Sequence, residues 1–179
     1  RITFNPISGN LMVAEVGNNN WEEVTEAGRG ANLGWPCIEG PMPNAYDPIC
    51  QPVLSGQTQV ISPTYSYPHS NGRGATIGGA FVANRAWPAQ YRNAYYFADF
   101  NVGVIYQMTF DGAGKAIVNE FITVIPGPVQ LSTGPDGNLY ILSVQLGALY
   151  RVRWTGPSGL AMPTATPTPK GAKGGSAAT

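Results

Sequence analysis

Short apolar runs separated by glycine- and proline-containing turns are the feature that most constrains what this chain can fold into. No stretch repeats apolar residues at helical spacing, and short or alternating apolar runs occur along most of the length. We predict strands at residues 11–14, 77–82, 95–98, 104–108, 121–125, 139–142 and 149–154. Turn signals separate these runs at Ser8-Gly9-Asn10, Asp111-Gly112, Asp136-Gly137-Asn138 and Thr155-Gly156-Pro157. The pattern predicts an all-β fold.

A weak internal repeat narrows the choice of architecture. A turn followed by Gly-Asn-Leu and an apolar strand occurs at residues 9–13 and again at 137–141. The two copies are separated by about three units of the ~40 to 45 residues that one β-propeller blade occupies. This spacing predicts a partial β-propeller of about three to four blades. A β-sandwich whose hairpins share the same turn chemistry explains the repeat almost equally well.

Composition excludes some classes of partner. The 10 basic and 10 acidic side chains cancel, and charged residues make up only 11% of the chain, so neither nucleic acid nor an anionic membrane is expected as a partner. No run approaches the ~18 apolar residues of a membrane span, and no signal peptide is visible. The chain begins with Arg1 inside a strand-like run, so we expect its true start to be missing.

Two further features concern organisation. Residues 157–179 are rich in Pro, Thr, Gly and Ala, which predicts a disordered linker or tail after a domain spanning 1–156. Cys37 and Cys50 flank a loop in which a disulfide would contribute about 3 kcal/mol in an oxidising compartment. The alternative is two free thiols.

Few residues offer catalytic chemistry. His69 is the only histidine and lies on a Gly-rich stretch, where a surface or pocket-lining role is the plainer interpretation. The sequence GNNNWEEV offers a hard cation such as Ca²⁺ the Gly17 carbonyl and a carboxylate of Glu22 or Glu23. From spacing alone, the two adjacent acids are better explained by a solvated strand edge.

A family resemblance then emerges from motifs that occur in order from Arg1 to about Gly156. These are GNLMVAEVGNNNWEEV, ANLGWPCIEG, PTYSYPHSNGRGATIGGAFV, AYYFADFNVGVIYQM and GPVQLSTGPDGNLYIL. They resemble the C-terminal half of the glucose/sorbosone dehydrogenase family. The resemblance implies a six-bladed β-propeller, secreted, periplasmic or on the surface of a bacterial cell. Enzymatic members oxidise sugars with pyrroloquinoline quinone (PQQ) and Ca²⁺.

The resemblance also assigns expected roles to single residues. Gly17 falls where a backbone carbonyl holds the Ca²⁺ that binds the quinone, and Glu23 falls where a carboxylate binds a structural Ca²⁺. Asn18 and Asn101 fall in the expected cofactor pocket, whereas the catalytic base is expected upstream of Arg1. Leu33 replaces a family Tyr, a departure that weakens the structural-metal assignment.

The cations that bind the quinone in the enzymes are missing from their expected positions. A family Lys is replaced by Asn101 or Val102, and two Arg are replaced by the uncharged residues 126–130. Each lost charged hydrogen bond would cost about 1.5 to 3 kcal/mol. Quinone binding of the usual kind is therefore in question.

These observations leave three hypotheses for function. The first is a PQQ- and calcium-dependent aldose dehydrogenase in which hydride passes from sugar C1 to the quinone; the missing N-terminal half of the propeller would be its partner. The second is a non-catalytic extracellular propeller that binds carbohydrate or protein. Its aromatic candidates are Trp21, Trp35, Tyr65, Tyr67 and Trp87, although blade packing is expected for Trp35 and Trp87. The third is a purely structural module.

Overall fold

The computed structural model describes residues 1–44, 48–156 and 166–168. Most of the predicted linker, and the disorder predicted for it, therefore lie outside the described residues. Three residues of that segment, Thr166–Thr168, pair with a neighbouring strand. No helix in the described parts of the chain is long and apolar enough to cross a membrane.

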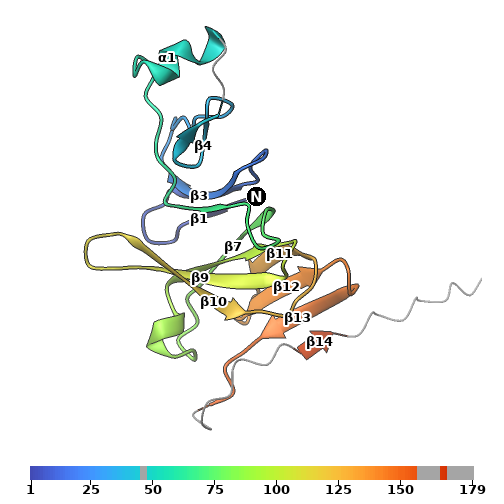
Figure 1. Cartoon of the computed structure of the whole chain (residues 1–179). Coiled ribbons are helices and arrows are strands. Elements are labelled where there is room, and N and C mark those ends of the chain that lie inside the picture. Colours follow the sequence, from blue (N-terminus) through green and yellow to red (C-terminus); the bar gives the residue numbers. More distant parts are fainter. Residues whose placement is uncertain (45–47, 157–165, 169–179) are drawn as a thin grey trace, which may run out of the picture.

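Three four-stranded antiparallel sheets form the body of the molecule (Figure 1). The first sheet contains β1 (Ile2–Phe4), β2 (Leu11–Glu15), β3 (Trp21–Ala27) and β6 (Tyr65–Pro68). The second contains β7 (Thr76–Val82), β8 (Ala94–Asp99), β9 (Val104–Phe110) and β10 (Ala116–Ile122). The third contains β11 (Pro128–Thr133), β12 (Leu139–Ser143), β13 (Ala148–Val152) and β14 (Thr166–Thr168).

The sheets are stacked as successive blades. The strands follow the order of the chain from one edge of each sheet to the other. The first strand of the second sheet, β7, contacts both β1 and β11, the first strands of its neighbours. Placing first strands side by side is the arrangement around a propeller axis. The predicted all-β partial propeller is confirmed, and the sandwich alternative is wrong.

The core lies in two layers, one on each side of the second sheet. Between the first and second sheets are Met12, Val24, Tyr95 and Phe97, and between the second and third are Tyr96, Ile105, Leu139 and Ile141, among others. Strand β8 is buried on both faces, so its residues 94–98 are apolar or aromatic without alternation. Full burial of each large β8 side chain contributes roughly 2 to 3 kcal/mol.

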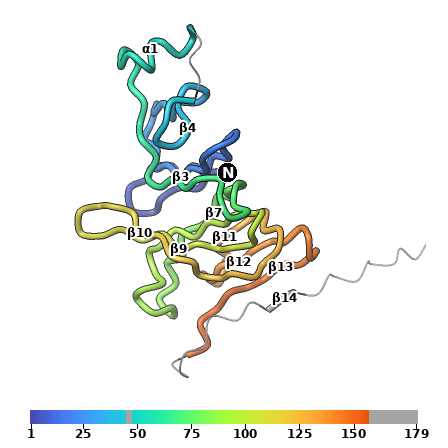
Figure 2. Tube along the Cα trace, in the orientation of Figure 1, coloured from blue at the N-terminus to red at the C-terminus, as the bar shows by residue number. Residues whose placement is uncertain are grey.

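A long connection between β3 and β6 extends from the first sheet, at the blue-to-cyan end of the trace (Figure 2). It carries the short ribbon of β4 (Ile38–Glu39) and β5 (Met42–Pro43), then η1 (Pro48–Cys50) and α1 (Gln51–Leu54). The predicted disulfide between Cys37 and Cys50 is present here. The other short helix, η2 (Ala89–Tyr91), precedes β8.

The strand predictions hold in the apolar segments and fail elsewhere. Strand β3 carries charged and polar residues, and sequence reasoning missed it as a strand of the core. The predicted strand at 121–125 belongs to β10, which starts earlier and ends at Ile122. Most residues of that strand alternate between exposed and half-buried, and only Phe121 and Ile122 are buried. The apolar run in the sequence therefore identifies only the last two residues of β10.

Candidate functional site

Loops from all three sheets meet at one end of the molecule. They connect β2 to β3, β6 to β7, β8 to β9, β10 to β11 and β12 to β13. Backbone hydrogen bonds join each loop to the next: His69 N–H to Asn20 O at 2.8 Å, Phe100 to Ala75 at 2.8 Å, Ile125 to Gly103 at 3.0 Å and Val144 to Gly127 at 2.9 Å. The loops therefore form one continuous face.

A fully buried carboxylate, Glu22, ties two of these loops together. Its Oε1 accepts the Gly17 N–H at 3.2 Å and lies 2.6 Å from His69 Nε2, and its Oε2 accepts the Thr76 N–H at 2.6 Å. Burial raises the pKa of Glu22, and the three donors oppose that rise. The His69 ring lies over Gly74, where an added Cβ would approach ring atoms to 3.3 Å. Glu22 thus links the first two blades through hydrogen bonds in the interior.

A second buried carboxylate, Asp99, ties the β6–β7 loop to the β8–β9 loop. Its Oδ2 accepts the Tyr67 hydroxyl at 2.9 Å, and its two oxygens accept the backbone N–H groups of Gly74, Ala75, Asn101 and Val102. Backbone donors of this kind stabilise a buried charge without a cation. The face is therefore held in place by carboxylates below it.

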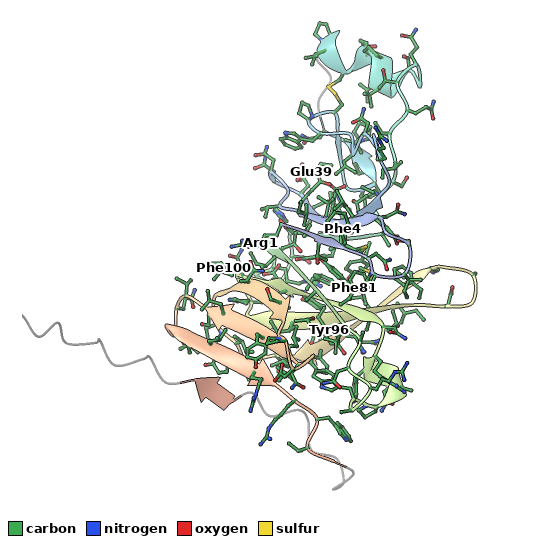
Figure 3. All side chains as sticks on the ribbon, turned by 180° about the vertical axis from the view of Figure 1, so that it is seen from behind. Arg1, Phe4, Glu39, Phe81, Tyr96 and Phe100 are labelled. Atoms are coloured by element: carbon green, nitrogen blue, oxygen red, sulfur yellow. A yellow bond between two sulfur atoms is a disulfide. The ribbon has the colours of Figure 1, made fainter. Side chains whose placement is uncertain are left out.

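A third carboxylate, Glu39, reaches the same face from the β4–β5 ribbon. Its Oε1 accepts the N–H groups of Asn19, Asn20 and Trp21 at 2.8 to 3.1 Å. Burial would raise the pKa of Glu39, but these hydrogen bonds outweigh burial and lower it. Sequence reasoning did not identify Glu39, because the contact crosses the long connection and no local motif signals it. The labelled side chain lies where that connection meets the first sheet (Figure 3).

A cavity of about 270 Å³ opens beside this loop. Its lining consists of Glu15, Val16, Gly17, Glu23, Trp35 and Glu39. Glu15 and Glu23 are cross-strand partners on β2 and β3, and like charges placed directly opposite repel. Glu15 Oε2 is buried without a hydrogen-bond partner. The cavity is therefore acidic and lacks an internal cation.

Electrostatic strain is concentrated at Glu23. Its side chain is only 8% exposed, and its Oε1 accepts the Gly40 N–H at 2.7 Å. Burial, reinforced by the charges of Glu15 and Glu39, raises the pKa of Glu23 to about 7. Burial also raises the pKa of Glu15. A bound cation would relieve both effects.

The structure brings the two predicted metal residues together, since Gly17 and Glu23 line one cavity. No three Asp, Glu, His or Cys side chains converge into a metal site anywhere in the described residues. Backbone oxygens would have to complete any coordination there. The alternative of a solvated strand edge for the adjacent acids is wrong, because Glu22 is 0% exposed and Glu23 nearly as buried.

The other candidate residues are placed differently. His69 faces Glu22 and is absent from the lining of the acidic cavity. Asn18 and Asn101 are exposed on two different loops of the face, and the Asn101 N–H is used by Asp99. Trp87 packs in the core as expected, whereas Trp35, for which packing was also expected, is 55% exposed at the cavity. That expectation for Trp35 is corrected, because its loop leads outward from the sheet instead of into a blade.

Basic side chains are scarce on this face. Among the described loops at this end, Arg73 is the one with a charged nitrogen, and it lies over the Tyr67 ring at 5.6 Å, bonded to Ser70. The positions expected to lack cations, Asn101 with Val102 and residues 126–130, lie on the face or beside it. Arg73 lines a cavity together with Val102, and residues 126–130 contain no basic side chain.

Comparison with known proteins gives consistent matches. The family described as Glucose / Sorbosone dehydrogenase matches residues 1–151. Two proteins of Arabidopsis thaliana match about half of the chain: HIPL1 protein at 32% identity over 98 residues and HIPL2 protein at 30% over 96 residues. The matches span only 14% and 13% of those proteins.

Solved structures share the fold over 79% of the chain. A glucose dehydrogenase superimposes with a TM-score of 0.59 at 22% identity, covering 39% of that protein. The soluble aldose sugar dehydrogenase of Escherichia coli, in its apo-form, gives 0.57 at 20% identity and 40% coverage. The PQQ-bound aldose sugar dehydrogenase of Streptomyces coelicolor gives 0.53 at 13% identity and 36% coverage.

Proposed function

Because this chain belongs to the glucose/sorbosone dehydrogenase family, we propose that it forms part of the active face of a sugar-oxidising dehydrogenase. The observation that carries the proposal is the acidic cavity lined by Gly17 and Glu23 on a face of interlocked loops. The chain spans 36–40% of the solved relatives, so the activity would belong to a longer assembly of blades. The remaining blades of the propeller would be its first partner.

Calcium fits the residues of this cavity. A hard cation takes carboxylate and backbone carbonyl oxygens, and Glu15 Oε2 is a buried oxygen that lacks a partner. Glu15 and Glu23 would hold the ion together with backbone carbonyls of Val16 and Gly17. Glu39 would keep its role in the loop, because one of its oxygens already accepts three N–H groups. A bound calcium ion would add positive charge to a face whose described loops carry Arg73 as their one Lys or Arg side chain.

The quinone fits less well. PQQ carries three carboxylates, and the described loops offer only Arg73 as a cation, already engaged with Tyr67 and Ser70. The residues present do not form a quinone site of the family's usual kind. PQQ binding and hydride transfer from sugar C1 would depend on cations and a base from the rest of the propeller, and no step of that reaction is assigned to this chain.

A second candidate function has one observation in its favour. The exposed indole of Trp35 lies beside carboxylates that accept hydrogen bonds, and an aromatic platform with nearby acceptors suits a sugar ring. A non-catalytic propeller that binds carbohydrate or protein would need no quinone cations. Either function suits an extracytoplasmic compartment, where the Cys37–Cys50 disulfide persists. The bacterial origin stays a prediction.

Dye-linked oxidation of aldoses by the full-length protein, supplied with PQQ and calcium, tests the proposal. The enzyme hypothesis predicts sugar-dependent dye reduction that requires both additions. Calcium binding without dye reduction, combined with saturable binding of an oligosaccharide, would favour the second function. Absence of calcium binding and of dye reduction would reject the dehydrogenase proposal.

A further inference from the structure

His69 reaches the β2–β3 loop by two routes. Its backbone N–H donates to the Asn20 carbonyl at 2.8 Å, and its ring Nε2 lies 2.6 Å from Glu22 Oε1. The same Oε1 accepts the Gly17 N–H at 3.2 Å. The histidine side chain and the Gly17 peptide therefore share one carboxylate oxygen.

Glu22 depends on the donors that reach it, because its side chain is 0% exposed. Two of them, Gly17 and Thr76, are backbone N–H groups, and the third is the His69 ring. Removing one partner of a buried charged pair leaves the other poorly compensated. Without the ring, the carboxylate would lose one of its three donors and shift position, and its hold on the Gly17 N–H would weaken.

The Gly17 N–H in turn sets the direction of a backbone oxygen. The Val16–Gly17 peptide is trans, so its C=O and N–H point in opposite directions. Glu22 and Glu23 point to opposite faces of β3, and the acidic cavity lies on the Glu23 face. Because Glu22 holds the Gly17 N–H on the opposite face, the Val16 carbonyl points toward the acidic cavity, which Val16 helps to line.

We infer that His69 is a positioning residue for the proposed calcium site: through Glu22 it fixes the Val16–Gly17 peptide and the direction of its oxygen. The inference rests on the proposed function, because it concerns the same cavity. His69 does not contact the ion and is not a catalytic residue. Partners that hold metal ligands in place typically change metal affinity by 10- to 100-fold when removed.

Calorimetric titration of the calcium-free full-length protein with CaCl₂ tests this role in four proteins. They are the wild type, His69→Leu, which removes the donor, His69→Gln, which retains a side-chain N–H, and Trp87→Phe. The last removes a hydrogen bond of similar length, Trp87 Nε1 to Asn138 Oδ1 at 2.9 Å, between blades remote from the cavity. The Trp87 variant controls for a general loss of stability.

We expect calcium affinity to fall at least tenfold in His69→Leu, recover substantially in His69→Gln and stay unchanged in Trp87→Phe. Unchanged affinity in His69→Leu, or an equal loss in Trp87→Phe, would overturn the inference. If the wild type does not bind calcium, the calcium proposal and this inference both fail. If the wild type binds calcium and His69→Leu binds it equally well, only this inference fails.

Amide hydrogen exchange in calcium-free protein provides a second readout. The Gly17 N–H should exchange faster in His69→Leu than in wild type, whereas amides of β12 should not change. If His69→Leu does not fold, the isosteric Glu22→Gln replaces it in both measurements, with the same expected direction. Equal Gly17 exchange in wild type and variant would contradict the positioning role.

Discussion

The Glu39 carboxylate contacts Asn20 through both of its oxygens: Oε1 accepts the Asn20 N–H at 2.8 Å and Oε2 accepts the side-chain Nδ2 at 3.3 Å. This pairing joins the long connection after β3 to the loop before it. On its other side, the same loop is tied to Glu22 and His69. The loop that offers backbone oxygens to the acidic cavity is thus held from two directions.

Glu39→Ala should destabilise the protein by about 3 kcal/mol, because it leaves three part-buried N–H groups without an acceptor. Glu39→Gln retains an acceptor oxygen and should cost less. Denaturant unfolding of both variants measures the difference. Equal stability of wild type and Glu39→Ala would show that the loop does not depend on this carboxylate.

Gly17→Ala should disrupt the loop even though the added group is a single methyl. A Cβ at this position would lie 1.6 Å from the Trp21 carbonyl oxygen and 2.7 Å from Glu39 Oε1, so the backbone must move. We expect a clear fall in the melting temperature and loss of calcium binding. Gly112→Ala is the matched control, since no atom lies within 4 Å of its added Cβ. Similar behaviour of the two variants would contradict the packing at Gly17.

Glu23→Gln should flatten the dependence of stability on pH in calcium-free protein. The pKa of Glu23 is raised to about 7 by burial, so the folded state binds the proton more tightly than the unfolded state. Stability from this proton is present below the ordinary value of 4.5 and is lost as pH rises through about 7. Thermal melts at several pH values should therefore show a steeper decline for wild type, by a few degrees.

Added calcium should make the wild type more stable than Glu23→Gln at neutral pH, because the ion binds the ionised carboxylate of the wild type and stabilises the folded state. Parallel pH profiles for wild type and Glu23→Gln in calcium-free buffer would rule out a raised pKa at this position.

Replacing both Cys37 and Cys50 with Ser should lower the free energy of unfolding by about 3 kcal/mol. The unfolded chain then loses a cross-link between residues 13 positions apart and gains conformational entropy. The effect should resemble that of a reductant on wild type, and the reductant should leave the double variant unaffected. Thermal unfolding with and without dithiothreitol measures both. A reductant effect on the double variant would point to another cause.

Sequence patterns predict the fold here because the blades need little more than apolar strands and turns. Strand β8 is recognisable by the unbroken apolar and aromatic run at residues 94–98, which a strand covered on both faces requires. The Gly-Asn-Leu repeat marks equivalent turns before β2 and β12, one in the first blade and one in the third. Local chemistry determines these features, so a single sequence is sufficient to find them.

The sequence predicted only those residues of the site that lie together in one short motif. Gly17 and Glu23 are close in sequence, and both line the cavity. Glu15 lies beside Glu23 because β2 pairs with β3, and Glu39 reaches the cavity from the long connection after β3. Neither contact is marked by a motif in the sequence. Adjacent acids usually indicate a solvated edge. Here the neighbouring blade covers Glu22 and the connection covers Glu23, and tertiary packing of this kind is absent from the sequence pattern.

Calorimetric titration with CaCl₂ of the full-length, calcium-free protein, compared with the Glu15→Gln/Glu23→Gln double variant, tests most directly whether the acidic cavity binds calcium. The glutamines retain size and hydrogen-bonding capacity while removing the two carboxylate charges. We expect saturable binding of calcium by the wild type and a loss of affinity of about tenfold or more in the variant. Indistinguishable titrations of the two proteins would contradict a calcium site in this cavity.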